Sequence, residues 1–188
     1  MKKSLKPLVA ESQSSQLVLI DVQARLVQAM SDRKSLLRHC EILIRAATLM
    51  AVPVLLTEQY PKGLGMTEPV LAEQLPDNVI PIAKTCFSCC GSDKFNTALS
   101  SGDRNQVILA GIEAHVCVLQ TALELSQQGR QVFVVADATD SRARENKNLA
   151  LERLRQAGVI ITTTESVLFE WLKDAKHEQF KNVTALIR

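Results

Sequence analysis

Short apolar runs alternate along this chain with longer segments in which apolar residues recur at helical spacing. Polar residues do not occupy every second position of the short runs, so each run predicts a strand buried on both faces. The strands are expected at residues 17–22, 54–57, 79–82, 105–110, 131–136 and 159–162. Helices are expected at residues 33–51, 68–75, 92–100, 116–128, 145–157 and 165–173.

This alternation predicts an α/β fold, a three-layer α/β/α sandwich on a doubly wound, six-stranded parallel sheet. We expect the strand order 3-2-1-4-5-6, in which ligands bind beyond the carboxyl ends of the first and fourth strands. A chain of 188 residues is long enough for one domain with a full core. That domain is expected over residues 16–188, after a loose N-terminal arm over residues 1–15 that is rich in Ser, Gln and Lys.

The composition argues against nucleic-acid and membrane partners. The formal net charge is only +2, and no cluster of Lys and Arg is interleaved with aromatic residues. No apolar stretch approaches the roughly 20 residues that span a bilayer. The first apolar run stops at Asp21, so we expect no secretory signal. An odd number of cysteines, five, in such a chain predicts reduced thiols and a cytoplasmic location.

The segment GIEAHVC, residues 111–117, has the architecture of a nucleophile site. A glycine ends the fourth expected strand, a tight turn follows, and Cys117 opens the next helix. The N–H groups in the first turn of a helix are unpaired, and the helix dipole is positive there. Both effects are expected to lower the pKa of a thiol and to favour a nearby oxyanion. Cys117 is therefore the candidate nucleophile.

Two other reactive side chains are expected at the same edge of the sheet. Asp21 stands at the carboxyl end of the first strand, and Lys84 follows the third. Taken singly, Asp21 is also explained as a turn residue, Lys84 as a surface lysine and Cys117 as a small buried residue. Together they suit acyl transfer, in which Asp21 accepts the thiol proton, Lys84 stabilises the thiolate and Cys117 attacks an electrophilic carbon.

Three blocks of the sequence resemble those of a known family. The blocks are LIDVQ at residues 19–23, KTCFS at residues 84–88 and GIEAHVCV at residues 111–118. Their order and approximate spacing are similar to those of the isochorismatase-like cysteine hydrolases, which include nicotinamidases and N-carbamoylsarcosine amidohydrolases. The resemblance covers residues 17–171. Residues 52–65 resemble a narrower branch, the isochorismatase domain-containing proteins.

The resemblance implies a catalytic triad of Asp21, Lys84 and Cys117. It also implies a non-proline cis peptide between Ile112 and Glu113, which would aim the N–H of Glu113, with that of Cys117, at an oxyanion. The implied reaction is hydrolysis of a C–N bond in a small amide or carbamoyl compound through a thioester on Cys117. Family members also form dimers, tetramers and larger rings, so the resemblance implies a homo-oligomer.

The chain departs from nicotinamidases in one respect. Those enzymes have an Asp-x-His segment after the second strand that binds a metal, whereas this chain has Glu58-Gln59-Tyr60 there. Its histidines lie elsewhere, at positions 39, 115 and 177. We therefore expect no metal and no cofactor. Residues 59–67 are expected to form a loop over the site, with Gln59, Tyr60 and Phe87 as candidate substrate contacts.

Other functions stay open on the sequence alone. Cys86, Cys89 and Cys90 are compatible with a thiol redox pair, a zinc site or ordinary burial. A protein that kept the scaffold for binding or assembly and lost efficient turnover is a further alternative. We expect His115 to have a peripheral or structural role. The apolar segment at residues 167–171 fits either a subunit contact or packing on the sheet.

Overall fold

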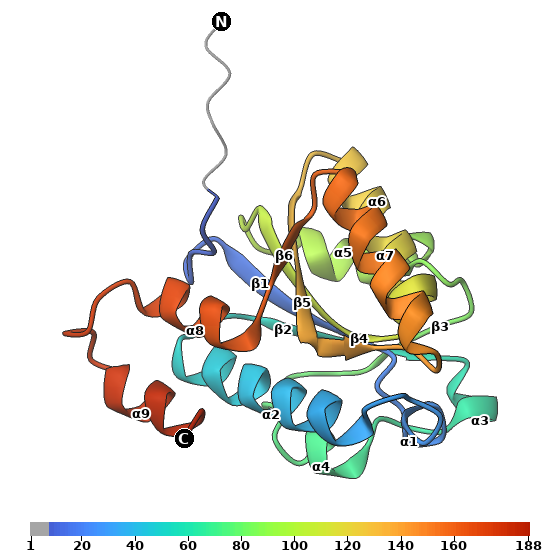
Figure 1. Ribbon diagram of the computed structural model, residues 1–188, viewed down its shortest axis with the longest axis horizontal. Coiled ribbons are helices and arrows are strands. Elements are labelled where there is room, and N and C mark those ends of the chain that lie inside the picture. Colours follow the sequence, from blue (N-terminus) through green and yellow to red (C-terminus); the bar gives the residue numbers. More distant parts are fainter. Residues whose placement is uncertain (1–7) are drawn as a thin grey trace, which may run out of the picture.

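The computed structural model describes residues 8–188, which form a three-layer α/β/α sandwich (Figure 1). The central sheet has six parallel strands in the order β3-β2-β1-β4-β5-β6, so the predicted fold class and strand order are confirmed. The strands are β1 (Ser15–Ile20), β2 (Val54–Gln59), β3 (Ile82–Lys84), β4 (Gln106–Ile112), β5 (Gln131–Asp140) and β6 (Ile160–Thr162).

Helices cover both faces of the sheet. One layer contains α2 (Arg33–Leu49), α8 (Thr164–Leu172) and α9 (Phe180–Ala185), and the other contains α5 (Asp93–Ser100), α6 (Leu119–Gln127) and α7 (Arg144–Gln156) (Figure 1). Short helices lie in the connections, and they are α1 (Ala24–Val27), α3 (Pro61–Leu64), α4 (Pro69–Ala72), a 3-10 turn η1 (Cys89–Gly91) and a π-helical turn η2 (Ala114–Val118). No helix within residues 8–188 is long and apolar enough to cross a membrane.

The two hydrophobic cores explain why the strand runs lack polar alternation. Successive side chains of a strand point to opposite faces of the sheet. In β1, Leu17 and Leu19 pack in the core beneath α2 and α8, while Val18 and Ile20 pack in the core beneath α5 and α6. All four are 0–1% exposed, so this central strand needs apolar residues at consecutive positions.

The third strand lies farther along the chain than predicted. It was expected at residues 79–82 but occupies Ile82–Lys84, where it pairs with β2. Pro81 lacks the N–H that a strand ladder requires, and the side chain of Ile80 is 79% exposed. The shift makes Lys84 the last residue of β3 rather than the residue that follows it.

Other boundaries differ because local irregularities end or extend the regular pattern. β4 and β5 run to Ile112 and Asp140, beyond the predicted limits, since a register shift between Leu109 and Gly111 lets their pairing continue. The helix expected from residue 116 begins earlier, as the η2 turn. The short helices α1, α3 and α9 were not predicted, because four to six residues are too few to display a helical repeat.

The N-terminal segment is described from residue 8 onward. Residues 1–7 of the expected arm lie outside the described part of the chain. In the remainder, Ala10 is buried, the N–H of Glu11 donates to Oε1 of Gln106 at 2.7 Å, and Ser15 already belongs to β1. The division of the chain into an arm and one domain stays a prediction.

The apolar segment near the C-terminus packs mainly on the sheet. Val167, Leu168 and Trp171 are buried, and the indole N–H of Trp171 donates to Ser15 Oγ at 3.1 Å. Phe169 is exposed, and its ring meets that of Phe180 edge-on, with centroids 6.5 Å apart. Of the two alternatives left open by the sequence, packing on the sheet explains most of this segment.

Candidate active site

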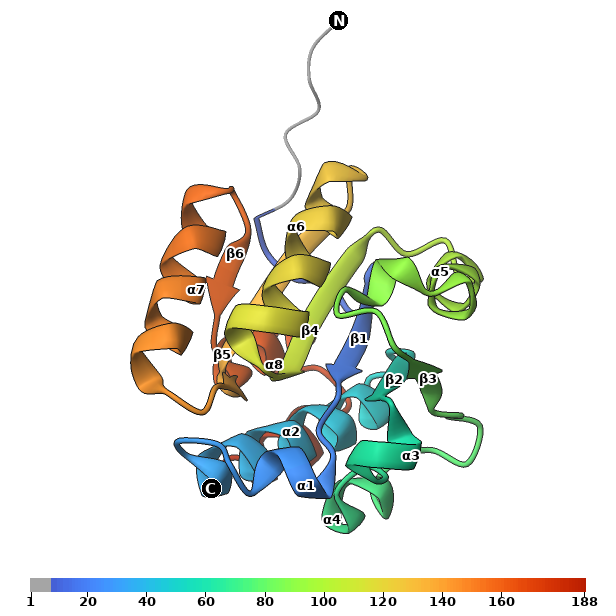
Figure 2. The ribbon, with the colours of Figure 1, turned by 90° about the vertical axis from the view of Figure 1, so that its right-hand side faces the viewer.

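The reactive side chains predicted from the sequence lie at one edge of the sheet. Because the strands are parallel, their carboxyl ends share an edge, which lies beside α1 and α3 in Figure 2. Asp21 follows β1 with a backbone φ of 54°, Lys84 ends β3, and Cys117 lies in η2, directly after β4. This edge includes the point where the strand order reverses, between β1 and β4.

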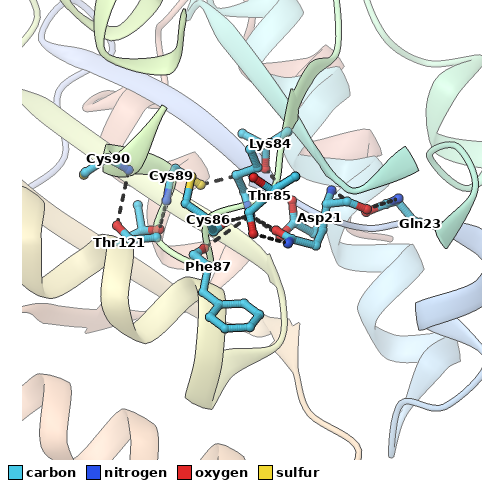
Figure 3. Close-up of polar contacts among 12 residues, drawn as sticks. Asp21, Gln23, Lys84, Thr85, Cys86, Phe87, Cys89, Cys90 and Thr121 are labelled. Carbon is cyan, nitrogen blue, oxygen red and sulfur yellow. Dashed lines mark hydrogen bonds and ion pairs between the residues drawn. The ribbon is translucent and has the colours of Figure 1, made fainter. Parts of the chain in front are cut away.

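Asp21 and Lys84 form a buried ion pair. Lys84 Nζ lies 2.7 Å from Asp21 Oδ2, and the two side chains are 0% and 1% exposed, respectively (Figure 3). The second carboxylate oxygen, Oδ1, accepts a hydrogen bond from Thr57 Oγ1 at 2.7 Å. Each oxygen of the carboxylate therefore has its own donor, Thr57 from β2 and Lys84 from β3, which fixes the orientation of the carboxylate.

Four oxygen atoms surround the ammonium group of Lys84. Besides Asp21, they are Oε1 of Gln59 at 2.7 Å and the carbonyl oxygens of Cys86 and Phe87, each at 3.2 Å (Figure 3). Burial by itself lowers the pKa of Lys84, but the charge and hydrogen bond of Asp21 act in the opposite direction, and the net shift of the pKa is upward. The ammonium group is therefore a fixed positive charge rather than a proton donor at neutral pH.

The thiol of Cys117 is largely buried and neutral. Its residue is 6% exposed, and burial, followed by the negative charge of Asp21, raises the pKa of Cys117 to about 12, while Lys84 acts in the opposite direction. The lowered pKa expected from the helix N-terminus is therefore wrong. The N–H groups of Val116 and Val118 donate to the carbonyl oxygen of Glu113, so Cys117 lies within the π-helical turn that precedes α6 and not at a regular helix N-terminus.

The turn before Cys117 has the backbone geometry that the family resemblance implied. The peptide bond between Ile112 and Glu113 is cis. Glu113 extends its carboxylate to Arg142, accepting hydrogen bonds from the main-chain N–H at 3.0 Å and from Nε at 3.2 Å. His115 Nδ1 lies 3.0 Å from Ser141 Oγ, so this histidine faces β5 and the following loop.

The three candidate substrate contacts differ in their environment. Gln59 is engaged inside the site, since its Oε1 accepts from Lys84 and its Nε2 donates to the carbonyl oxygen of Thr85 at 2.7 Å. Tyr60 and Phe87 are 54% and 57% exposed, and the ring of Phe87 points away from Lys84 (Figure 3). A cavity of about 470 Å³ lies along β3, and its lining includes Tyr60 and Cys86 but neither Phe87 nor Cys117.

The loop of residues 59–67 is held by side chains that the sequence did not single out for this purpose. Gln23 exchanges hydrogen bonds with the main chain of Gln59, at 2.7 and 3.0 Å, and also donates to the carbonyl oxygen of Gly65. Glu58 is 2% exposed, and its Oε1 accepts from both the N–H and the hydroxyl of Thr67 at 2.7 Å. Glu58 therefore anchors the loop and does not face the site.

The remaining cysteines are free thiols in the structure. Cys89 is fully buried, with Sγ 3.8 Å from Thr57 Oγ1, and burial raises the pKa of this thiol to about 12. Its backbone N–H donates to Thr121 Oγ1 at 2.9 Å (Figure 3). The part of the chain that is described contains no group of three or more His, Cys, Asp or Glu side chains arranged to hold a metal ion.

Comparison with known proteins identifies the family to which this parallel α/β sandwich belongs. Residues 15–166 match the Isochorismatase domain family, and the chain belongs to the isochorismatase-like hydrolase family. This finding confirms the resemblance seen in the three sequence blocks.

Similar proteins cover nearly the whole chain. Isochorismatase domain-containing protein 2 of Danio rerio is 39% identical over 176 residues, covering 94% of this chain and 88% of that protein. The structure described as MAR1 ribonuclease from Caenorhabditis elegans is 37% identical, with a TM-score of 0.91, covering 95% of this chain and 92% of that one. The YcaC gene product of Escherichia coli, described as an octameric hydrolase of unknown specificity, is 25% identical, with a TM-score of 0.87, covering 98% and 91%.

Proposed function

We propose that this protein is a cysteine hydrolase that cleaves a C–N bond of a small amide or carbamoyl compound without a metal or other cofactor. Cys117 is the nucleophile, Asp21 the base and Lys84 the fixed positive charge. The observation that carries the proposal is the buried ion pair, 2.7 Å between Nζ and Oδ2, whose charges both act on the Cys117 thiol. Family membership supports the hydrolase class.

The raised pKa of the thiol indicates how the nucleophile forms. Asp21 takes the proton of Cys117 as sulfur attacks the substrate carbon, so an ionised carboxylate and a thiol become a carboxylic acid and a thiolate. The number of bound protons does not change, and Lys84 stays positive beside whichever group is negative. Such a transfer inside a low-dielectric site avoids leaving a second negative charge buried.

The remaining steps use the same groups. The C–S bond forms, and the carbonyl oxygen becomes an oxyanion for which the N–H groups of Cys117 and Glu113 are the proposed donors. The C–N bond then breaks, and the amine leaves with the proton held by Asp21. Water attacks the thioester on Cys117, and Asp21 accepts the proton of that water and returns it to the sulfur.

The residues at the end of β2 support the cofactor-free proposal. The segment Glu58-Gln59-Tyr60 stands where nicotinamidases have their metal-binding Asp-x-His segment, and the carboxylate of Glu58 is engaged by Thr67. The amide oxygen of Gln59 is engaged by the ammonium group of Lys84 at 2.7 Å, and its amide nitrogen donates to Thr85. Gln59 thereby supports the ion pair by a neutral contact. Tyr60, Phe87 and the adjoining cavity are proposed to bind the rest of the substrate.

The pH dependence of Cys117 alkylation tests this assignment without knowledge of the substrate. Iodoacetamide labelling, read by peptide mass spectrometry, should be nearly independent of pH across the neutral range, because the proton only moves between Cys117 and Asp21. The same cysteine in the urea-unfolded chain should react about tenfold faster per pH unit below pH 8.5. Asp21→Asn should abolish the plateau. A tenfold rise per unit in the folded wild type would contradict the role of Asp21.

A screen for ammonia release from a library of small amides and carbamoyl compounds tests the substrate class. Cys117→Ser should remove the activity, and Cys90→Ser, at a free thiol outside the cavity lining, should retain it. Hydrolysis of RNA is the second candidate, favoured by the description of the 37%-identical nematode structure as a ribonuclease. A short single-stranded RNA therefore belongs in the same assay. Inactivity on both classes, with no alkylation plateau, would favour a binding or assembly protein.

We also infer that the protein forms a homo-oligomer. The bacterial neighbour described as octameric shares the fold over 98% of this chain. Sedimentation velocity at micromolar concentration should show an assembly larger than the 20.7 kDa chain. A single 20.7 kDa species at all concentrations would refute self-association.

A further inference from the structure

Thr57 contacts the proposed base from the strand that lies between the two members of the ion pair. β2 is inserted between β1, which leads to Asp21, and β3, which ends at Lys84. Thr57 is 0% exposed, its Oγ1 lies 2.7 Å from Asp21 Oδ1, and its carbonyl oxygen accepts the N–H of Asp21 at 3.1 Å. The threonine therefore binds both the main chain and the side chain of Asp21.

The surroundings of Thr57 determine where its hydroxyl hydrogen points. An ionised carboxylate only accepts hydrogen bonds, so the 2.7 Å contact requires the hydroxyl to donate. On the other side, the Cys89 thiol donates to Thr57 Oγ1 at 3.8 Å. Burial keeps the Cys89 thiol protonated, since its pKa is raised to about 12. The hydroxyl hydrogen of Thr57 is therefore donated to Oδ1 of Asp21.

The side chains of β2 that contact the ion pair and the side chain that anchors the loop of residues 59–67 lie on opposite faces of the sheet. Side chains at positions i and i+2 of a strand share a face. Thr57 and Gln59 both point to the ion pair, where they contact Asp21 and Lys84 at 2.7 Å. Glu58, between them, points to the opposite face and bonds to Thr67. Only the Thr57 contact reaches the group that must exchange protons.

We propose that Thr57 is a positioning residue that keeps Asp21 ionised and oriented toward Cys117, by donating its hydroxyl hydrogen to Oδ1 while Lys84 occupies Oδ2. This inference rests on the proposed function, because it gives Asp21 the role of base. A hydrogen bond to the ionised form of an acid favours that form. Thr57 thereby sets the lower pH limit at which the thiol can be activated.

The variant Thr57→Val removes the hydroxyl and keeps a branched side chain of similar shape. In the wild type, the rate of Cys117 alkylation by iodoacetamide should have a lower pH limit, below which it falls off. In Thr57→Val this acid limit should move upward by about one to two pH units, the amount expected for loss of one hydrogen bond to a charged group. Thr57→Ser retains a hydroxyl and should leave the limit near that of wild type.

Thr121→Val is the matched control. Thr121 is also 0% exposed, and its hydroxyl accepts from the N–H of Cys89 at 2.9 Å. The same chemical change at this site should affect stability without moving the acid limit. If Thr57→Val does not fold, Thr57→Ala removes the same hydroxyl with a smaller side chain, and the same upward shift is expected.

The outcomes separate this inference from the function on which it rests. An acid limit that vanishes in Asp21→Asn but stays in place in Thr57→Val and Thr57→Ala would overturn the role of Thr57 alone. An equal shift in Thr121→Val would also overturn it, because the effect would then be a general loss of packing. A wild-type profile without any acid limit would overturn both the base assignment and this inference.

Discussion

Replacing Lys84 with methionine should destabilise the protein because it leaves the Asp21 carboxylate buried without a cation. The two side chains are 0% and 1% exposed, and the ammonium group is held by four oxygens. Breaking a buried ion pair by removing one partner costs about 3–5 kcal/mol. For a chain of this length, that cost lowers the melting temperature by roughly 6–20 °C.

The charge on Asp21 should make this cost depend on pH. A buried carboxylate that has lost its cation binds a proton more readily than the same group in the unfolded chain. The folded Lys84→Met variant should therefore gain protons relative to the unfolded state, and its stability should rise as the pH falls from 7 to 5. Urea unfolding at both pH values measures the effect. Adding Asp21→Asn should recover much of the loss at pH 7.

An exposed lysine provides the matched control. Lys173 pairs with Glu11 at 2.9 Å, but the two side chains are 58% and 38% exposed. Lys173→Met makes the same chemical change where solvent screens the pair, so its urea midpoint should stay close to that of wild type. Equal midpoints for Lys84→Met and Lys173→Met, or an equal loss in the Asp21→Asn background, would refute the reasoning about burial.

Three further changes have expected outcomes. Gly111→Ala should lower the free energy of unfolding in urea by about 3–5 kcal/mol. The backbone φ of Gly111 is +114°, and an added Cβ would lie 2.1 Å from a carbonyl oxygen of β1. Gly158→Ala is the control, because Gly158 also has a positive φ, +83°, but an added Cβ would meet nothing within 4 Å. Burial raises the pKa of Cys40 from 9.0 to about 12, so the buried neutral thiol contributes stability that should be lost as the pH rises above 9. The free energy of unfolding of the wild type should therefore fall more steeply between pH 9 and 11 than that of Cys40→Ala. Glu58→Ala should release the loop at Thr67 and speed tryptic cleavage after the exposed Lys62 of α3. Glu58→Gln keeps an oxygen that accepts both hydrogen bonds from Thr67, so its cleavage rate should stay near that of the wild type.

The fold was predictable because its signals are local and repeated. Consecutive apolar residues in β1 indicate burial on both faces, and the alternation with helices leaves few arrangements of parallel strands. The same logic placed Asp21, Lys84 and Cys117 at one edge, since residues that follow parallel strands end together. The position of β3 was missed because Pro81 interrupts a run whose composition otherwise resembles a strand.

The details of the site depend on contacts that no local pattern encodes. In the sequence, Thr57 is an ordinary strand residue, and the role of its hydroxyl emerges only from the 2.7 Å contact with Asp21. The pKa of Cys117 was predicted in the wrong direction, because the helix dipole could be inferred from the sequence but the depth of burial could not. Glu58 and Gln59 are neighbours, and strand alternation sends them to opposite faces, which becomes clear only once β2 is placed.

The carbonyl oxygens of Cys86 and Phe87 that contact Lys84 constrain how the protein can diversify. Both belong to the main chain, so the path of the segment after β3 is tied to the same ammonium group that balances the charge of Asp21. Relatives could therefore carry different side chains in this segment while the path of its backbone is unchanged. New substrate preferences would then arise by swapping protruding groups such as the phenyl ring of Phe87, and insertions or deletions between residues 84 and 87 should be rare.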